Sequence, residues 1–112
     1  MTRAVLFKDA AGRIQGVSVK GHSGYAEEGS DIVCAGISAL VITTDQALCT
    51  LVGIVPIEHG GEDGFAEILL PDALTDQQME QAQLLFGALQ LGLQGIAEQY
   101  PAYFRLTTQR VR

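Results

Sequence analysis

The chain opens with two short segments whose pattern of apolar residues predicts β-strands. Arg3–Phe7 contains four consecutive apolar residues, and the second half of Ile14–Lys20 alternates valine with polar residues, as a strand with one buried face does. Asp9–Gly12 predicts the turn between them, and Gly16 indicates a β-bulge in the second strand. Gly21–Ser30 follows with three glycines and few apolar residues, which predicts a loop.

The longest apolar segment of the chain, residues 31–52, predicts a helix that is buried on most of its sides. Its β-branched residues leave a strand possible, but an apolar run of this length favours a helix. Apolar side chains cover nearly every direction around the helix axis: Ile32, Val33, Ala35, Ile37, Ala39, Leu40, Val41 and Ile42. In a chain of 112 residues, we therefore expect a sheet on one side of this helix and a second helix or a second subunit on the other. The apolar run ends at Ile42, short of the roughly 20 residues that a membrane-spanning helix needs.

A hairpin is predicted next. Ile54–His59 is typical of a strand, and Pro56 indicates the edge of a sheet or the end of the strand, because proline cannot donate a ladder hydrogen bond. The glycines of Gly60–Gly64 predict the hairpin turn, with Phe65–Leu70 as the returning strand.

A second helix and a last strand complete the predicted fold. Thr75–Gln78 matches a capping box, so the helix begins at Thr75. One apolar face recurs at spacings of three and four residues: Met79, Ala82, Phe86, Leu89, Leu93, Ile96 and Tyr100. Pro101 ends the helix, and Tyr103–Thr108 is the last strand. The order β-β-α-β-β-α-β predicts one α+β domain over residues 1–112, a two-layer sandwich of two long helices on a mostly antiparallel or mixed sheet.

The charge balance argues against an anionic partner. Seven basic and thirteen acidic residues give a net charge of −6, and the basic residues gather only at the C-terminus, in Arg105, Arg110 and Arg112. Because phosphate backbones and anionic membranes attract basic surfaces, we expect no direct nucleic-acid binding and no membrane association. The N-terminal apolar run is too short for a secretory signal, which predicts a cytoplasmic protein with two free cysteines.

Cys34 is the first candidate for chemistry because it falls in the first turn of the first predicted helix. With Ser30 or Asp31 as the N-cap, the thiol lies at the positive end of the helix dipole, which favours the thiolate form. The Asp31 carboxylate would oppose that effect if it faced the sulfur. His22 precedes Cys34 by twelve residues, and the intervening loop could bring its imidazole to the thiol as a base. One cysteine and one histidine at this separation are a weak signal of a catalytic pair. Cys34 could instead be a small core residue, and His22 a surface residue.

The other candidate residues have simpler interpretations. Cys49 lies about 22 Å further along the same predicted helix, beyond the ~7 Å reach of a disulfide, and is expected in the core. His59 is expected as a solvated hairpin residue. Ser38, one turn after Cys34, could hydrogen-bond toward the thiol or the histidine, or back to a helix carbonyl. These residues lack the paired short spacings of zinc sites, and no nucleotide-binding motif is present, so no metal or cofactor is expected.

A longer motif resembles that of a known family. Gly21-His22-Ser23, then Gly29-Ser30-Asp31-Ile32-Val33-Cys34-Ala35-Gly36-Ile37-Ser38, closely resembles the motif of the bacterial ribosomal-processing cysteine proteases, the Prp or YsxB-like family. Gly92-Leu93, Ile96-Ala97 and Tyr100-Pro101 are also similar to that family, so the resemblance covers nearly the whole chain. Ser23 and Gly36 stand where the family usually has alanine.

This resemblance implies a homodimeric α+β peptidase with a Cys/His dyad. Cys34 would be the nucleophile, and His22 the base that later protonates the leaving amine. Family members remove a short N-terminal extension from large-subunit ribosomal protein twenty-seven, so the expected partner is that ribosomal precursor.

The resemblance also implies roles around the dyad. The loop between the two residues would be a flap over the substrate, carrying Ser23, Gly24 and Gly29. Asp31 is the nearest candidate for a supporting role, and Ser38 is a second. Two other functions remain as alternatives. A non-catalytic ribosome-assembly or adaptor protein would have no need of an intact histidine and cysteine, and a thiol redox sensor would need a resolving cysteine within reach.

Overall fold

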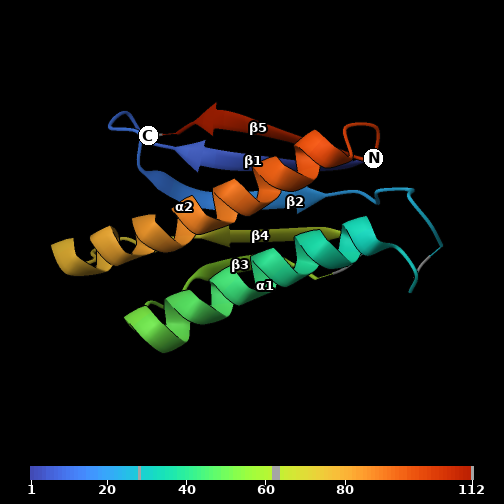
Figure 1. Cartoon of the computed structure of the whole chain (residues 1–112). Helices are drawn as coiled ribbons and strands as arrows, with labels where there is room; N and C mark the ends of the chain where they lie inside the picture. The colour runs from blue at the N-terminus through green and yellow to red at the C-terminus, as the bar shows by residue number, and fades with distance from the viewer. Residues whose placement is uncertain (28, 62–63, 112) are drawn as a thin grey trace.

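The computed structural model describes residues 1–27, 29–61 and 64–111, and residues 28, 62–63 and 112 lie outside the described part. Five strands form one sheet in the order β3-β4-β2-β1-β5, in which β1 and β5 are parallel and the other neighbours are antiparallel. Both helices cover the same face of this sheet (Figure 1). The elements are β1 (Thr2–Lys8), β2 (Ile14–Lys20), α1 (Ile32–Val52), β3 (Ile57–Gly60), β4 (Phe65–Leu69), α2 (Asp76–Gln99) and β5 (Phe104–Arg110). The predicted α+β sandwich and its element order are confirmed.

The bulge predicted at Gly16 is present in β2. Phe7 pairs with Gly16 and Lys8 with Ile14, so Gln15 is the extra residue in the antiparallel pair. A Cβ on Gly16 would overlap the carbonyl oxygen of Ile68 on the neighbouring strand, so only glycine fits here. Beyond the bulge, Val17 and Val19 are buried in the core.

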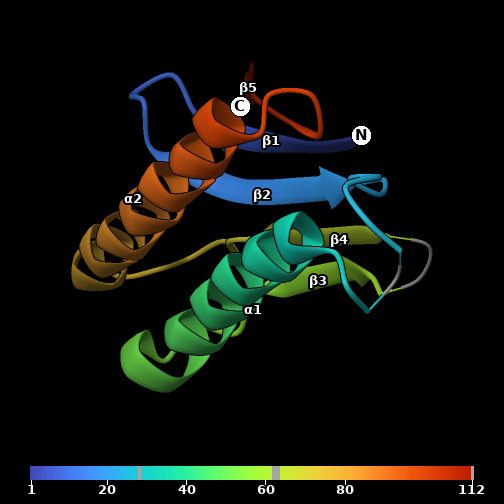
Figure 2. The same ribbon diagram turned by 45° about the vertical axis from the view of Figure 1, so that its right-hand side comes forward.

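Helix α1 has the predicted bounds but a narrower buried face than predicted. Asp31 is its N-cap, and Gly53 ends it in the left-handed conformation at φ 75°. One stripe is buried against the sheet: Val33, Ile37, Val41, Thr44 and Leu48. The prediction that α1 is buried on most sides is wrong, because α2 lies beside it in the same layer rather than opposite the sheet (Figure 2). Ile32 and Leu51 are therefore 56% and 72% exposed.

By length and composition, α1 would also be apolar enough to cross a membrane. Core helices of soluble proteins share this length and composition. The expectation that the apolar run is too short to span rested on its first eleven residues, whereas the helix continues to Val52.

Strand β3 begins later than predicted. Ile54 is a core residue, and its amide donates to the carbonyl of Leu48 as α1 ends, so it belongs to the helix exit rather than to the sheet. The strand starts after Pro56 and lies at the edge of the sheet, which confirms the interpretation of that proline. The predicted hairpin turn includes residues 62–63, which lie outside the described part.

Helix α2 follows its prediction closely. Thr75 and Gln78 form the predicted capping box, and the helix ends just before Pro101. Its core contacts come from the predicted face, with Ala82, Phe86, Leu89 and Leu93 buried. Strand β5 runs two residues beyond the predicted Thr108, and it carries Arg105 and Arg110 as exposed residues. Arg112, the third member of the predicted basic cluster, lies outside the described part.

Candidate active site

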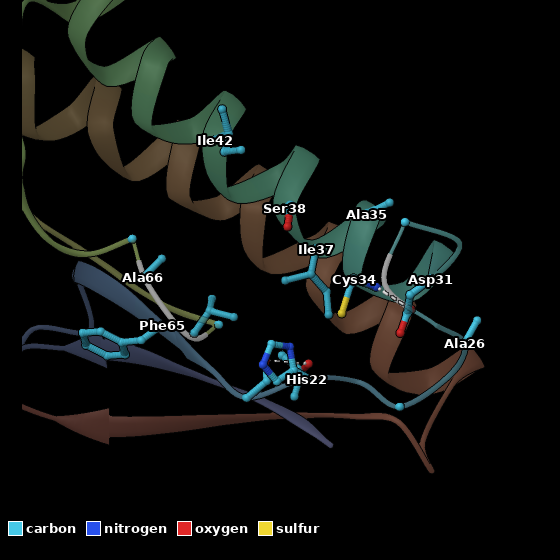
Figure 3. A pocket seen from close by; sticks show the side chains of 17 residues that line it. His22, Ala26, Asp31, Cys34, Ala35, Ile37, Ser38, Ile42, Phe65 and Ala66 are labelled. Atoms are coloured by element: carbon cyan, nitrogen blue, oxygen red, sulfur yellow. Dashed lines mark hydrogen bonds between the residues drawn. The ribbon is translucent and has the colours of Figure 1, made fainter.

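A cavity of about 830 Å³ opens at the N-terminal end of α1. Its walls come from the start of α1, the end of β2, the loop after β2 and the start of β4 (Figure 3). His22 and Cys34 both line it, and Figure 3 shows their side chains directed into the same space. The structure thus brings together the two residues that the sequence singled out.

Helix α1 positions Cys34 through its cap. Asp31 takes an extended backbone conformation, at φ −84° and ψ 101°, and its Oδ1 accepts the Cys34 amide at 2.9 Å. Cys34 is therefore the third helical residue, half-buried and facing the cavity. Of the two N-caps that the sequence allowed, Asp31 is the one used.

The Asp31 carboxylate is held in its ionised form. Partial desolvation acts to raise the pKa of Asp31, but a hydrogen bond from the Ser23 hydroxyl and bonds from three backbone amides outweigh it. The pKa is lowered to about 2 as a result. The three amides are those of Cys34, Ala26 and Val33. Asp31 thus ties the loop to the helix and occupies amides of the first helical turn.

Ser23 is buried at the base of the loop and joins these groups. Its hydroxyl donates to Oδ2 of Asp31 and accepts the amide of Tyr25 at 3.2 Å. The Cys34 sulfur lies 3.5 Å from the same oxygen, with the thiol as donor. The sequence predicted Ser23 only as a flap residue. Sequence reasoning missed this additional role, because Ser23 precedes the N-cap Asp31 by eight residues and only the folded loop brings them together.

His22 is placed by two glycines. Gly21 turns the chain out of β2 at φ 96°, and its amide donates to the carbonyl of Gly64 at 3.0 Å. This bond joins the His22 segment to the start of β4 and leaves the imidazole exposed within the cavity. Sequence reasoning missed Gly64, because its contact with residue 21 spans a long stretch of chain.

The remaining predicted loop and supporting residues lie around the cavity. Gly24 and Gly29 line it and adopt left-handed conformations, at φ 73° and 88°. Ser38 also lines it, as an exposed residue one turn beyond Cys34. Tyr25 extends away from the loop and packs on aromatic residues at the end of α2, a contact that sequence reasoning missed.

Cys49 and His59 lie away from the cavity. The prediction that Cys49 is a core residue is wrong, because its side chain is exposed on α1. His59 is exposed on β3, as predicted, and its Nδ1 lies 3.0 Å from Oε1 of Glu67. Among the described residues, no group of three or more His, Cys, Asp and Glu side chains is placed to hold a metal ion.

Comparison with known proteins identifies the family of this site. Residues 1–105 match the family model described as cysteine protease Prp. The chain belongs to this family. The ribosomal processing cysteine protease Prp of Bacillus subtilis (strain 168) is 32% identical over 109 residues, which cover 96% of this chain and 97% of that protein.

Solved structures of the Prp family share the fold. The ribosomal processing protease Prp of S. aureus, in complex with a covalently linked product peptide, matches with a TM-score of 0.87 at 29% identity, over 97% of this chain and 100% of that one. A structure of the S. aureus protease with a substrate peptide matches with a TM-score of 0.81 at 27% identity, over the same shares. The family resemblance found in the sequence is confirmed, and the chain is a member of the cysteine protease Prp family.

Proposed function

We propose that this protease removes a short N-terminal extension from the precursor of large-subunit ribosomal protein twenty-seven, with Cys34 as nucleophile and His22 as general base. The observation that carries the proposal is the shared cavity, which gathers a cysteine from α1 and a histidine from the end of β2. The S. aureus relatives with bound product and substrate peptides support a peptide as the ligand of this cavity.

The proposed chemistry needs only these two side chains and water. His22 takes the thiol proton, and the thiolate attacks the carbonyl carbon of the scissile peptide bond. The protonated imidazole then gives its proton to the leaving amine, which departs and leaves a thioester on Cys34. Water, deprotonated by His22, hydrolyses the thioester and regenerates the thiol.

The walls of the cavity support an extended, partly apolar peptide segment. Ile37 and Ile42 of α1 and Phe65 and Ala66 of β4 are among the residues that line the cavity. Pockets of roughly 300 to 1,000 Å³ enclose ligands of a few residues in size, so this cavity suits a short segment rather than a folded domain. A disordered N-terminal extension is a substrate of that kind.

Incubation with the extended precursor tests the proposal directly. Mass spectrometry of the products should show a precursor shortened at its N-terminus and a released peptide. Cys34→Ala should abolish cleavage with an unchanged circular-dichroism spectrum, because a half-buried first-turn cysteine contributes little to packing. Cys49→Ala is the matched control, since this cysteine is outside the cavity, and it should cleave normally. Intact precursor after incubation with the wild-type protein would instead favour the non-catalytic adaptor.

We also propose that the enzyme is a cytoplasmic homodimer that contacts its partner subunit through the exposed apolar side of α1 and the segment after it. Large apolar residues outside the cavity stand exposed there: Leu51, Val55 and Ile57. The net charge of −6 supports the further expectation that the enzyme does not bind nucleic acid directly. A gel shift with unrelated duplex DNA near physiological salt tests it.

A further inference from the structure

Ser23 lies beneath the cavity and contacts the side chains of both Asp31 and Cys34. Its Oγ donates to Asp31 Oδ2, accepts the Tyr25 amide at 3.2 Å, and lies 3.5 Å from the Cys34 sulfur. Ser23 is 2% exposed, so water does not compete for these bonds. This serine replaces the alanine that is usual in the family motif, so the arrangement belongs to this chain.

The direction of each hydrogen bond follows from a count of protons. A serine hydroxyl has one proton to donate and two lone pairs to accept with. The carboxylate of Asp31 is the strongest acceptor that the hydroxyl meets, because it is ionised, so the Ser23 proton stays on that bond. The side of Ser23 that faces Cys34 therefore presents a lone pair. A lone pair accepts a hydrogen bond from a thiol and repels a thiolate.

We propose that Ser23 is a positioning residue that links Asp31 to Cys34 and holds the resting cysteine as a thiol, with its proton directed to Ser23 rather than to His22. The inference rests on the proposed role of Cys34 as the nucleophile. When a peptide fills the cavity, rotation about the Cβ–Sγ bond turns the S–H toward His22, the imidazole takes the proton, and the thiolate forms beside the scissile carbonyl. A thiol that ionises only at this point is protected from alkylation and oxidation while the site is empty.

An asparagine at position 31 would reverse this link while keeping the helix cap. Asn is as good an N-cap as Asp, and its Oδ1 can still accept the Cys34 amide. Its Nδ2 replaces Oδ2 and is a donor, so Ser23 would accept from it and turn its own proton toward the sulfur. Asp31→Asn therefore favours the thiolate in two ways. It removes a nearby negative charge, and it converts Ser23 from acceptor to donor.

A double-mutant cycle separates the two effects. Besides Cys34, the titratable side chains among the described residues that line the cavity are His22 and Asp31, and His22 is unchanged throughout. All proteins carry Cys49→Ala, so that one thiol reacts. The pH–rate profile of alkylation by iodoacetamide is measured for four proteins: the parent, Asp31→Asn, Ser23→Ala and the double variant. Ser30→Ala, an exposed serine of the same loop, is the matched control for serine removal.

Asp31→Asn should accelerate alkylation about tenfold at a pH below the midpoint of the profile, because a thiolate that gains a donor forms more readily. In the Ser23→Ala background the same substitution should accelerate it threefold or less, since only the charge effect remains. An equal acceleration in both backgrounds, or none in the parent, would overturn the inference.

A second measurement tests the inference without Ser23→Ala, in case that variant fails to fold. The S–H stretching band of Cys34 in the infrared reports whether the thiol donates a hydrogen bond. Asp31→Asn should remove or shift that band at neutral pH, and an unchanged band would overturn the inference. Neither measurement uses a peptide. If the cycle shows coupling between Ser23 and Asp31 but the protein does not cleave the precursor, the proposed substrate is refuted and this inference is supported.

Discussion

The imidazole of His22 stands next to the space that a Cβ on Gly64 would occupy. A Cβ built on Gly64 would stand 3.1 Å from Cε1 of His22 and 2.7 Å from the carbonyl oxygen of Gly21. The Gly21 amide also donates a hydrogen bond to the carbonyl oxygen of Gly64, at 3.0 Å. The start of β4 therefore sets the position of the proposed base, although it is distant from His22 in the sequence.

Gly64→Ala should displace the imidazole and lower kcat/KM for precursor cleavage by roughly 100-fold, because a shift of about 1 Å in a reacting group has an effect of that order. Gly12→Ala is the matched control. Gly12 has a similar left-handed φ of 83°, but a Cβ there meets nothing within 4 Å. Equal losses in the two variants would show backbone strain rather than displacement of His22, and would contradict the prediction.

Tyr25 holds the loop after β2 against the end of α2. Its ring packs edge-on against Tyr100 at 5.5 Å and against Tyr103 at 5.2 Å between centroids, and such pairs contribute about 0.5–1.5 kcal/mol each. Tyr25→Ala should speed amide hydrogen exchange in the loop and raise the KM for the precursor more than it lowers kcat. Tyr25→Phe keeps the ring and should behave as wild type. A loop that exchanges equally in both variants would show that the aromatic contacts do not restrain it.

Asp45 makes the fold less stable at neutral pH. Burial raises its pKa, the hydrogen bond and negative charge of Glu58 on β3 raise it further, and the value reaches about 6 against an ordinary 3.8. A carboxyl whose pKa is raised by folding contributes its full stability below the unfolded value and loses it as the pH rises through the folded value. We therefore expect the melting temperature to fall between about pH 4 and pH 7.

Asp45→Asn should flatten this pH dependence and stabilise the fold at pH 8 by up to about 3 kcal/mol, the free energy equivalent of a shift of about two pKa units. Thermal unfolding at several pH values measures it. Asp72→Asn, at an exposed position, should leave the pH dependence unchanged. A melting curve of Asp45→Asn that falls with pH as steeply as wild type would contradict the assignment.

The proposed dimer predicts different effects on association for substitutions of two leucines with similar exposure. Leu51 on α1 is 72% exposed and Leu84 on α2 is 77% exposed. If α1 and its following segment form the interface, Leu51→Gln should weaken association at least tenfold in sedimentation velocity, and Leu84→Gln should have little effect. A wild-type species of about 12 kDa at micromolar concentration would contradict the dimer itself, since one chain has a mass of 11.9 kDa.

The sequence predicted the elements better than it predicted their exposure. The apolar run and the candidate capping residues predicted the bounds of α1, because these signals are local. The exposure of Cys49 could not be predicted from them. Apolar residues surround the whole axis of α1, and only the arrangement of α2 beside it decides which of them are covered.

The candidate site shows the same division. His22 and Cys34 were found through a motif, since their spacing alone is a weak signal. The link through Ser23 depends on where a buried hydroxyl points, and the contact of Gly64 with His22 depends on a hairpin that folds back from another part of the chain. Neither relationship has a local pattern, so the structure was needed to find them.

The parallel pairing of β1 with β5 has a consequence for synthesis. β1 matches β5 residue for residue, from Thr2 with Phe104 to Lys8 with Arg110. Because β1 is synthesised about a hundred residues before β5, it leaves the ribosome without this neighbour. Until β5 emerges, one side of β1 keeps unpaired amides and carbonyls, which other nascent strands can join. Closing a loop of this length is also slow compared with forming either helix. The newly made chain therefore depends on protection from aggregation during the interval in which its own sheet is incomplete.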